Sequence, residues 1–307
     1  MIWLLGGVLA LLVVATVIGQ WLRLRIKSEG GQKTIANLNS RTKAWWFMVA
    51  IFAGAMATGG LGSVILFGLM SFLALREFIT LTPTRLGDHR TLFWVFFLIT
   101  PLQYYLVASN WYGLFVILIP VYAFLFVPLR SAMGGDCERF LERAAKIQWG
   151  LMVCVYCVSH APALLFLNIP GYEGENGKLL FYFVCIAQIS DVLQYVWGKT
   201  LGRHKIAPHV SPNKTWEGFL GGIATTVAIG AGLWWATPFT PLQSAGMSLA
   251  ITLMGFAGGL VMSAIKRDRG VKDYGTLIEG HGGVMDRIDS ICFAAPVFYH
   301  LTRYCFT

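Results

Sequence analysis

The sequence predicts an all-α integral membrane protein, a polytopic bundle of about ten transmembrane helices in a single membrane domain. Of its 307 residues, 56% are hydrophobic and only 13% are charged, and the mean hydropathy is +0.63. Soluble domains carry about 25% charged residues, so this excess of apolar surface needs lipid as its solvent. The 34 glycines and 14% aromatic residues fit closely packed transmembrane helices with aromatic belts at the membrane surfaces.

Ten apolar segments approach or exceed the length of about 20 helical residues that crosses a bilayer. The first lacks a positively charged start and a typical cleavage site, so we expect a retained span rather than a signal peptide. We expect residues 1–180 to form the N-terminal helices and residues 181–307 to form the region that carries the chemistry. The ten segments are residues 2–22, 44–58, 61–76, 91–107, 111–128, 150–168, 179–198, 216–237, 245–264 and 289–303.

Loops rich in Lys and Arg alternate with nearly uncharged loops along the chain. The positive-inside rule therefore places the basic loops in the cytoplasm and both termini on the other side. The net charge of +9 then faces anionic lipid and does not indicate a nucleic-acid partner. We expect a multi-pass protein of a bacterial inner membrane, with a second copy of the chain as a candidate partner. The basic loops, residues 23–43, 76–90, 129–149, 199–215 and 265–288, hold 22 of the 24 Lys and Arg residues.

Asp191 is the only acidic residue in the core of a predicted span. An ionised carboxylate inside a bilayer costs a few kcal/mol and normally faces a polar cavity, a cation or a partner. Gln188, Gln194 and Tyr195 lie three or four residues from Asp191 and share its helix face. The sequence leaves two interpretations open: a functional carboxylate, or a buried ion pair with Arg or Lys that serves only packing.

The segment from Lys205 to Gly218 ends in a predicted helix start. Ser211-Pro212 indicates a turn, and Thr215 can cap the following helix and leave backbone N–H groups directed at the cytoplasm. Lys214 beside that helix N-terminus predicts a contact with phosphate. The alternative is a solvated basic loop that only sets the topology.

Residues 263–289 hold a dense set of cations, acids and glycines between two apolar spans. Gly282 and Gly283 let the backbone approach a ligand closely, and Asp286 and Asp289 share a face if the last helix begins there. Carboxylates suit Mg²⁺, which usually takes one or two of them together with substrate phosphates. An ion-paired loop without a ligand is the alternative. The cations that can neutralise a polyphosphate are Lys266, Arg267, Lys272 and Arg287.

Together these motifs resemble the signature of phosphatidate cytidylyltransferases, also called CDP-diacylglycerol synthases. The resemblance is strong over about residues 185–292, whereas residues 1–180 offer only Arg76-Glu77-Phe78 as a faint echo. Gln194 departs from the family pattern, which commonly has a small residue there, and the chain carries an additional N-terminal span. The matching elements are Ser263-x2-Lys266-Arg267-x4-Lys272-Asp273-x-Gly275, Gly280-His281-Gly282-Gly283-x2-Asp286-Arg287-x-Asp289, Ser211-Pro-x-Lys214-Thr215-Trp216-Glu217-Gly218 and Asp191-x3-Tyr195-x2-Gly198-Lys199.

The resemblance implies an enzyme of the lipid bilayer that converts CTP and phosphatidic acid to CDP-diacylglycerol and pyrophosphate with Mg²⁺. It implies metal-site roles for Asp191, Asp273 and Asp286, with Asp289 in support. A paralogue acting on another lipid phosphate, a transporter, and a paralogue that binds without turnover are the alternatives. The implied phosphate-binding or phosphate-orienting residues are Lys214, Lys266, Arg267, Lys272, Arg287, Ser211, Thr215, His281, Gly282 and Gly283.

Overall fold

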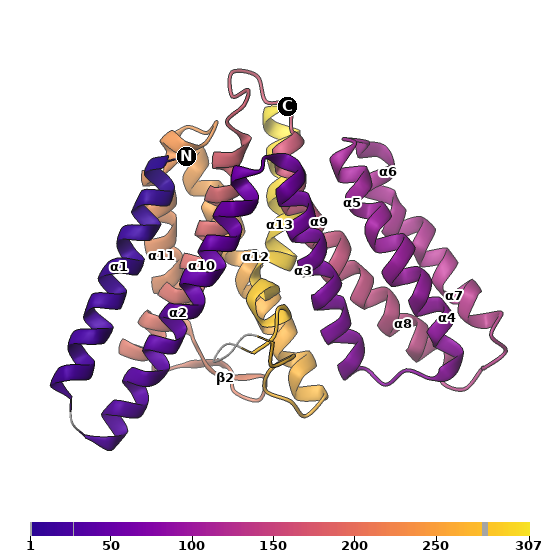
Figure 1. The fold of residues 1–307 in the computed structure, drawn as a ribbon, viewed down its shortest axis with the longest axis horizontal. Helices are drawn as coiled ribbons and strands as arrows, with labels where there is room; N and C mark the ends of the chain where they lie inside the picture. Colours follow the sequence, from indigo (N-terminus) through magenta and orange to yellow (C-terminus); the bar gives the residue numbers. More distant parts are fainter. Residues whose placement is uncertain (1, 27, 278–281) are drawn as a thin grey trace.

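The structure, a computed structural model, describes residues 2–26, 28–277 and 282–307, which form a bundle of helical rods and one small β-hairpin (Figure 1). The single-helix rods are α1 Ile2–Arg25, α2 Glu29–Ala57, α3 Gly60–Leu81, α10 Asn176–Thr200, α11 Trp216–Gly232, α12 Pro241–Asp268 and α13 Met285–Phe306. The composite rods are η1 Leu86–Asp88, α4 His89–Trp94, η2 Val95–Ile99 and α5 Thr100–Ala108; α6 Tyr112–Ile117, η3 Leu118–Ala123 and α7 Phe124–Ala132; and α8 Phe140–Gly150, η4 Leu151–Cys157, α9 Val158–Ala163 and η5 Leu164–Phe166. A short turn, η6 Trp234–Ala236, follows α11, and the strands are β1 Lys205–Ala207 and β2 Ser211–Thr215.

Every predicted span coincides with a helical rod. Among the described residues, seven rods are long and apolar enough to cross a membrane by length and composition. The prediction of an all-α polytopic membrane protein is therefore confirmed at this level. Several helices start earlier than the apolar pattern predicts: α2 begins at Glu29 and α8 at Phe140, inside the expected loops 23–43 and 129–149. Backbone hydrogen bonding continues past the apolar stretch, and hydropathy does not report these polar helix ends.

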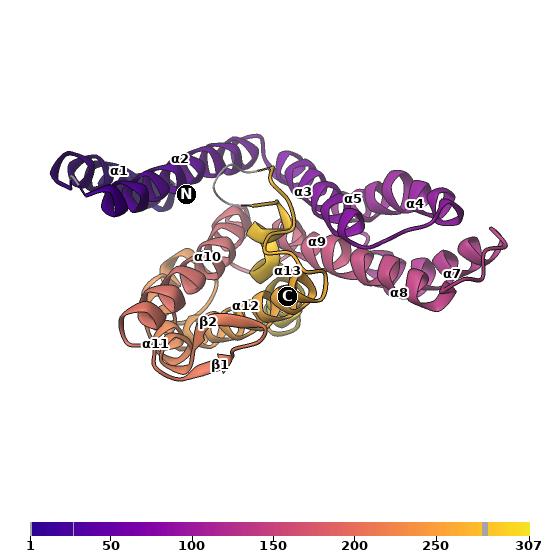
Figure 2. The ribbon, with the colours of Figure 1, turned by 90° about the horizontal axis from the view of Figure 1, so that it is seen from below.

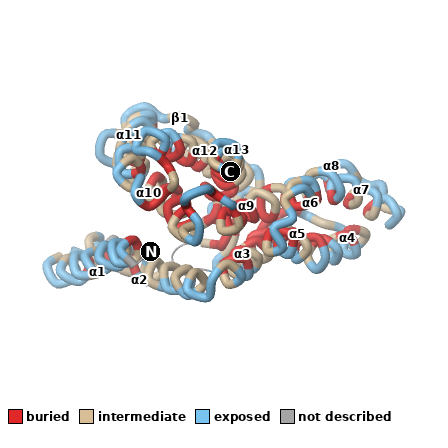
Figure 3. Tube along the Cα trace, turned by 90° about the horizontal axis from the view of Figure 1, so that it is seen from above, coloured by how far each residue is buried: buried red, intermediate tan, exposed pale blue. Residues whose placement is uncertain are grey.

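The basic segments share one end of the bundle. Figure 1 shows the end of α1, the start of α2, the α3–α4 and α7–α8 connections, the hairpin and residues 269–277 after α12 at its lower end, with both termini at the upper end. The rods lie in three groups, seen from below in Figure 2: α1 with α2, the α3–α9 group, and α10–α13. Buried residues concentrate where the second and third groups meet, while α1 and α2 are largely exposed or half-buried (Figure 3).

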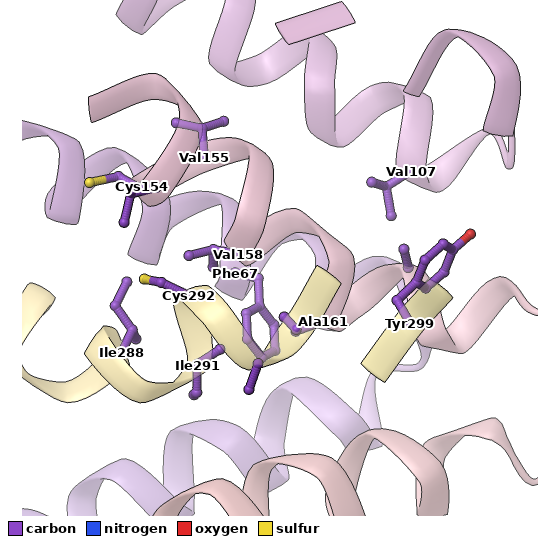
Figure 4. Close-up of a cluster of buried hydrophobic side chains, with 14 of the residues drawn as sticks. Phe67, Val107, Cys154, Val155, Val158, Ala161, Ile288, Ile291, Cys292 and Tyr299 are labelled. Carbon is purple, nitrogen blue, oxygen red and sulfur yellow. The ribbon is translucent and has the colours of Figure 1, made fainter. Parts of the chain in front are cut away.

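The main core holds the start of α13 against α3 and the η4–α9 rod. Figure 4 shows Phe67 of α3, Val158 of α9 and Ile291 of α13 within this core, where they are at most 4% exposed. Cys154 is also fully buried, and its Sγ contacts Met285 Sδ at 3.7 Å. Because lipid is as apolar as these side chains, close packing rather than transfer from water stabilises the contacts. This packing fixes the helix that carries Asp286 and Asp289.

A two-stranded hairpin precedes α11, in place of the simple turn that the sequence suggested. Strands β1 and β2 are antiparallel, with Lys205 opposite Thr215 and Ala207 opposite Ser211. The strands are short and include Pro212, so their sequence carries no clear alternating pattern. Thr215 ends β2 and caps α11, as predicted, because its Oγ1 accepts a hydrogen bond from the N–H of Gly218 at 3.1 Å.

Two glycines allow α10 and α11 to touch at this end. A Cβ atom on Gly218 would lie 2.7 Å from the backbone oxygen of Gln194 and 2.8 Å from the Cα of Gly198. Contacts that short are not tolerated, so glycine at position 218 lets the backbones approach. The close approach brings the end of β2, with Lys214, against the helix that carries Asp191.

Candidate active site

Two carboxylates from different helices form the centre of the site: Asp191 of α10 and Asp289 of α13. The charge of Asp289 acts on Asp191 through space. Among the described residues, no Lys, Arg or His nitrogen lies within 4.0 Å of either carboxylate. Asp289 Oδ1 accepts the N–H of the adjacent Ser290 at 2.8 Å. The interpretation of Asp191 as half of a close packing ion pair is therefore not supported.

Lys214 brings an ammonium group to the same place. Its Nζ lies 4.3 Å from the centre of the Phe256 ring and donates to the Phe256 carbonyl at 3.3 Å. A Cβ atom on Gly259 would lie 3.1 Å from Lys214 Nζ and 3.9 Å from Asp289 Oδ2. The Lys214 ammonium and the Asp289 carboxylate thus both lie next to α12 at Gly259, where no side chain separates them from the helix backbone. Burial lowers the pKa of Lys214, while the nearby Asp191 and Asp289 act in the opposite direction.

Arg287 is a second nearby cation, on α13. Its guanidinium acts on both Asp191 and Asp289 through space, and its buried Nε has no hydrogen-bond partner among the described residues. A buried donor without an acceptor costs about 1–3 kcal/mol. The backbone oxygen of Arg287 accepts a hydrogen bond from Gln188 Nε2 of α10 at 3.3 Å, which joins the two helices. A ligand that supplied an acceptor here would recover part of that cost.

Asp286, by contrast, is engaged on both oxygens. Its Oδ1 pairs with Lys266 Nζ at 2.8 Å, and its Oδ2 accepts the N–H groups of Tyr274 at 2.8 Å and Gly283 at 3.0 Å. The Asp286 side chain is only 4% exposed. The N–H of Gly283, which the sequence suggested for a phosphate, therefore donates to Asp286 in this structure. Asp286 folds the end of the glycine-rich loop onto α12.

Gly282 separates Asp286 from Asp273. Its φ angle is +80°, and an added Cβ would lie 2.7 Å from Asp286 Oδ2 and 3.1 Å from the Cβ of Asp273. Glycine is required on both counts. Asp273 and Lys272 are exposed at the rim of the site.

The remaining expected residues lie around this centre. Arg267 is exposed and donates to the carbonyl oxygens of Val210 at 3.3 Å and Val271 at 3.1 Å, which ties the end of α12 to the hairpin. Ser211 is half-buried in β2. The expected ligand role of His281 falls outside the described residues. No phosphate contact of Ser211, Thr215, Lys272 or Arg267 is tested by the structure, so these roles stay predictions.

Glu77 is a residue whose contact the sequence did not predict. It lies on α3, and its Oε1 and Oε2 accept the N–H groups of Val284 at 2.9 Å and Met285 at 2.8 Å. The sequence signal was the short Arg76-Glu77-Phe78 echo at the end of a span. This short motif could not predict that Glu77 bonds the backbone of Val284, 207 residues further along the chain.

The geometry suits phosphate chemistry more than a closed metal cage. Within the described part of the chain, no three His, Cys, Asp or Glu side chains come together as a ready metal site. Mg²⁺ does not require such a cage, because it keeps several waters and substrate oxygens. Two unpaired carboxylates beside two cations could accept a metal–phosphate complex.

Comparison with known proteins decides the family. The model of the cytidylyltransferase family matches residues 39–305. The chain belongs to the cytidylyltransferase family. This confirms the resemblance seen in the sequence and identifies the protein as a nucleotidyltransferase enzyme.

Named relatives of this cytidylyltransferase include two bacterial phosphatidate cytidylyltransferases. The one from Staphylococcus aureus (strain COL) is 27% identical over 265 residues, which cover 84% of this chain and 96% of the relative. The one from Bacillus subtilis (strain 168) is 30% identical over 243 residues, covering 78% and 85%. An "Uncharacterized protein YnbB" from Escherichia coli (strain K12) is 39% identical over 306 residues, covering 98% of each chain.

Proposed function

We propose that this cytidylyltransferase transfers the cytidylyl group of CTP to phosphatidic acid, giving CDP-diacylglycerol and pyrophosphate for phospholipid biosynthesis. The observation that carries the proposal is the incompletely paired cluster of Asp191, Asp289, Lys214 and Arg287 at the basic end of a membrane bundle. The names of the Staphylococcus and Bacillus relatives support phosphatidate as the acceptor.

The proposed step needs positioning and charge neutralisation rather than a covalent intermediate. An oxygen of the lipid phosphate attacks the α-phosphorus of CTP and forms a new P–O bond. The bond from the α-phosphorus to the bridging oxygen breaks, and its electron pair leaves with pyrophosphate. Lys214 and Arg287 would hold the phosphates and offset the charge on the leaving group. Lys266 lies close enough to Lys214 and Asp289 for its charge to act on both.

The donor set around Asp191 fits Mg²⁺. Two hard carboxylates without a close cationic partner, next to a phosphate site, are what this ion usually receives from a protein. Asp191 and Asp289 would hold the ion, with Asp273 at the rim as a further candidate, and Mg²⁺ when bound would supply charge neutralisation on the phosphates. Asp286 would contribute indirectly: its ion pair with Lys266 holds the chain next to the Asp191–Asp289 centre in place.

We propose that this chemistry takes place at the cytoplasmic face of the membrane, as the positive-inside rule favours. If all ten rods cross the membrane, the basic end shown in Figure 1 faces the cytoplasm and both termini face the other side of a bacterial inner membrane. CTP would enter from the basic end, and the lipid phosphate would enter sideways from the bilayer. The homodimer stays a prediction.

A different lipid phosphate is the second candidate acceptor. The Escherichia coli relative shares 39% identity across nearly the whole chain, N-terminal span included, and its name states no substrate. The phosphatidate cytidylyltransferases cited above are 27% and 30% identical over shorter ranges. Acceptor choice in this chain could therefore follow the Escherichia coli protein rather than those enzymes.

A lipid panel separates the two acceptors. Purified full-length protein in detergent is incubated with Mg²⁺, radiolabelled CTP and, in separate reactions, phosphatidic acid, lysophosphatidic acid or a polyprenyl phosphate. We expect labelled CDP-diacylglycerol with phosphatidic acid and several-fold less product with the other lipids. Product with another lipid alone would replace phosphatidic acid as the substrate, and no product with any lipid phosphate would contradict the proposed reaction.

A further inference from the structure

We infer that Glu77 is a positioning residue for the reaction: its carboxylate fixes the N-terminus of α13, and Gly275 and Gly283 leave the room that this carboxylate occupies. The inference rests on the proposed function, because α13 carries Asp289 and Arg287. Glu77 lies on α3, in the half of the chain where the family resemblance is faint. It nevertheless makes two hydrogen bonds, of 2.9 and 2.8 Å, to the backbone at the start of α13.

Two glycines, Gly275 and Gly283, lie against the Glu77 carboxylate. A Cβ atom on Gly275 would lie 2.8 Å from Glu77 Oε1, and one on Gly283 would lie 2.6 Å from Glu77 Cδ. Neither glycine has a positive φ angle, whereas Gly282, directly before Gly283, does. As long as Glu77 keeps its two hydrogen bonds to α13, Gly275 and Gly283 are therefore needed for space rather than for backbone conformation. The space they leave is filled by a side chain from α3.

Two carboxylates together accept three backbone N–H groups at this helix start. Glu77 takes the N–H groups of Val284 and Met285, and Asp286 takes that of Gly283. Negative charge at a helix N-terminus is stabilising, so Glu77 does here what a bound anion does elsewhere. With these three donors taken, we expect side-chain cations such as Lys214 and Arg287 to bind the substrate phosphates in place of these N–H groups. Glu77 thus sets where α13 begins and how Asp289 faces Asp191.

The test is a pair of double-variant cycles. Glu77→Ala and Gly283→Ala are made singly and together, and Glu77→Ala is likewise combined with Gly275→Ala. Steady-state kinetics with CTP and the acceptor lipid, and the thermal midpoint in detergent, are measured for each. We expect each single change to lower kcat by about 10- to 100-fold, as loss of outer-shell partners commonly does, with a smaller change in KM for CTP. The added methyl groups should cost little when Glu77 is already truncated.

Two control variants allow the inference to be tested even if Glu77→Ala folds poorly. Glu77→Gln keeps the shape but leaves one N–H facing an amide nitrogen, so we expect intermediate kcat and a near-normal thermal midpoint. Glu138→Ala, an exposed acid at the same end of the bundle, should leave kcat unchanged. A Gly283→Ala penalty that is the same with and without Glu77, or wild-type kcat in Glu77→Gln and Glu77→Ala, would overturn the inference. If the wild-type protein transfers no cytidylyl group, the proposed function fails, while the coupling between Glu77 and the glycines is still decided by the thermal midpoints.

Discussion

Two clusters of acids and cations lie at the basic end of the bundle, one buried and the other half-buried, and they differ in how completely they are paired. In the first, Arg143 of α8 bonds Asp88 Oδ2 at 3.0 Å and the Asp136 carbonyl at 2.8 Å, and Asp88 also accepts the N–H of Arg85 at 3.0 Å. The Arg143 and Asp88 side chains are 5% and 0% exposed. In the second, Asp191 and Asp289 have no close cation among the described residues, and Arg287 Nε has no acceptor.

This difference in pairing distinguishes charged residues that stabilise the fold from charged residues that are available to bind a ligand. The Asp88–Arg143 cluster is closed: it ties the α3–α4 connection to α8 and leaves little for a substrate to bond. The Asp191–Asp289 cluster is open, since like charges face one another and nearby cations remain free to bind phosphate. Buried charge is costly unless paired, so an open cluster persists where function requires it.

Neutralising one carboxylate of the open cluster is the most direct test of this comparison, and we expect it to have the largest effect. Asp191→Asn removes a proposed metal carboxylate and should lower kcat by at least about 100-fold, the scale at which loss of one charge-stabilising group is felt. The thermal midpoint measured without Mg²⁺ should stay the same or rise, because the repulsion between two carboxylates is relieved. A lower thermal midpoint with unchanged kcat would show that Asp191 stabilises the fold and does not take part in the reaction.

The same kind of change in the closed cluster should have the opposite result. Asp88→Asn removes the fully buried partner of Arg143 and leaves the partly exposed Asp136 carboxylate, 3.3 Å away, to pair with this buried cation. The cost should approach the value of about 3–5 kcal/mol that is typical of a broken buried ion pair. We expect a markedly lower thermal midpoint and faster inactivation in detergent. Activity per folded molecule should stay near the wild-type value, and a selective loss of kcat at wild-type stability would contradict the division.

A change at the α10–α11 contact below the open cluster should have a smaller effect, on both stability and the binding of CTP. Gly218→Ala places a methyl group against Gln194 and Gly198 and should cost about 1–3 kcal/mol. It should also raise KM for CTP, because α11 and Lys214 shift away from α10. Gly246→Ala on α12 is the matched control, since a Cβ there meets nothing within 4 Å. Equal behaviour of the two variants would remove the role of this contact.

The smallest effect concerns Thr215, which was expected both to cap α11 and to orient a phosphate. Thr215→Ala removes the cap and should lower stability by about 1 kcal/mol, while Thr215→Ser should retain most of it. Because the hydroxyl already accepts from Gly218, we expect only a small change in KM for CTP. A large rise in KM without a matching loss of stability would add a direct phosphate contact to the open cluster.

The sequence allowed prediction of features that depend on a few neighbouring residues. Asp191 stood out because an acid is costly inside a span, and the Thr215 cap followed from its position before a helix. Pairings between distant segments were not predictable: Asp88 with Arg143, and Glu77 with the start of α13, join residues 55 and 207 or more positions apart. The engagement of Asp286 with Lys266 and two backbone N–H groups likewise depends on how the loop folds. Single-residue chemistry is local, whereas the completeness of pairing is a property of the tertiary structure.

The central claim is that the open cluster is where cytidylyl transfer takes place. The most direct measurement compares labelled CDP-lipid formation by wild-type, Asp289→Asn and Asp88→Asn proteins, each normalised to the folded fraction, with CTP, Mg²⁺ and phosphatidic acid. We predict product from the wild-type and Asp88→Asn proteins and at least about 100-fold less from Asp289→Asn. Full activity of Asp289→Asn would contradict the account.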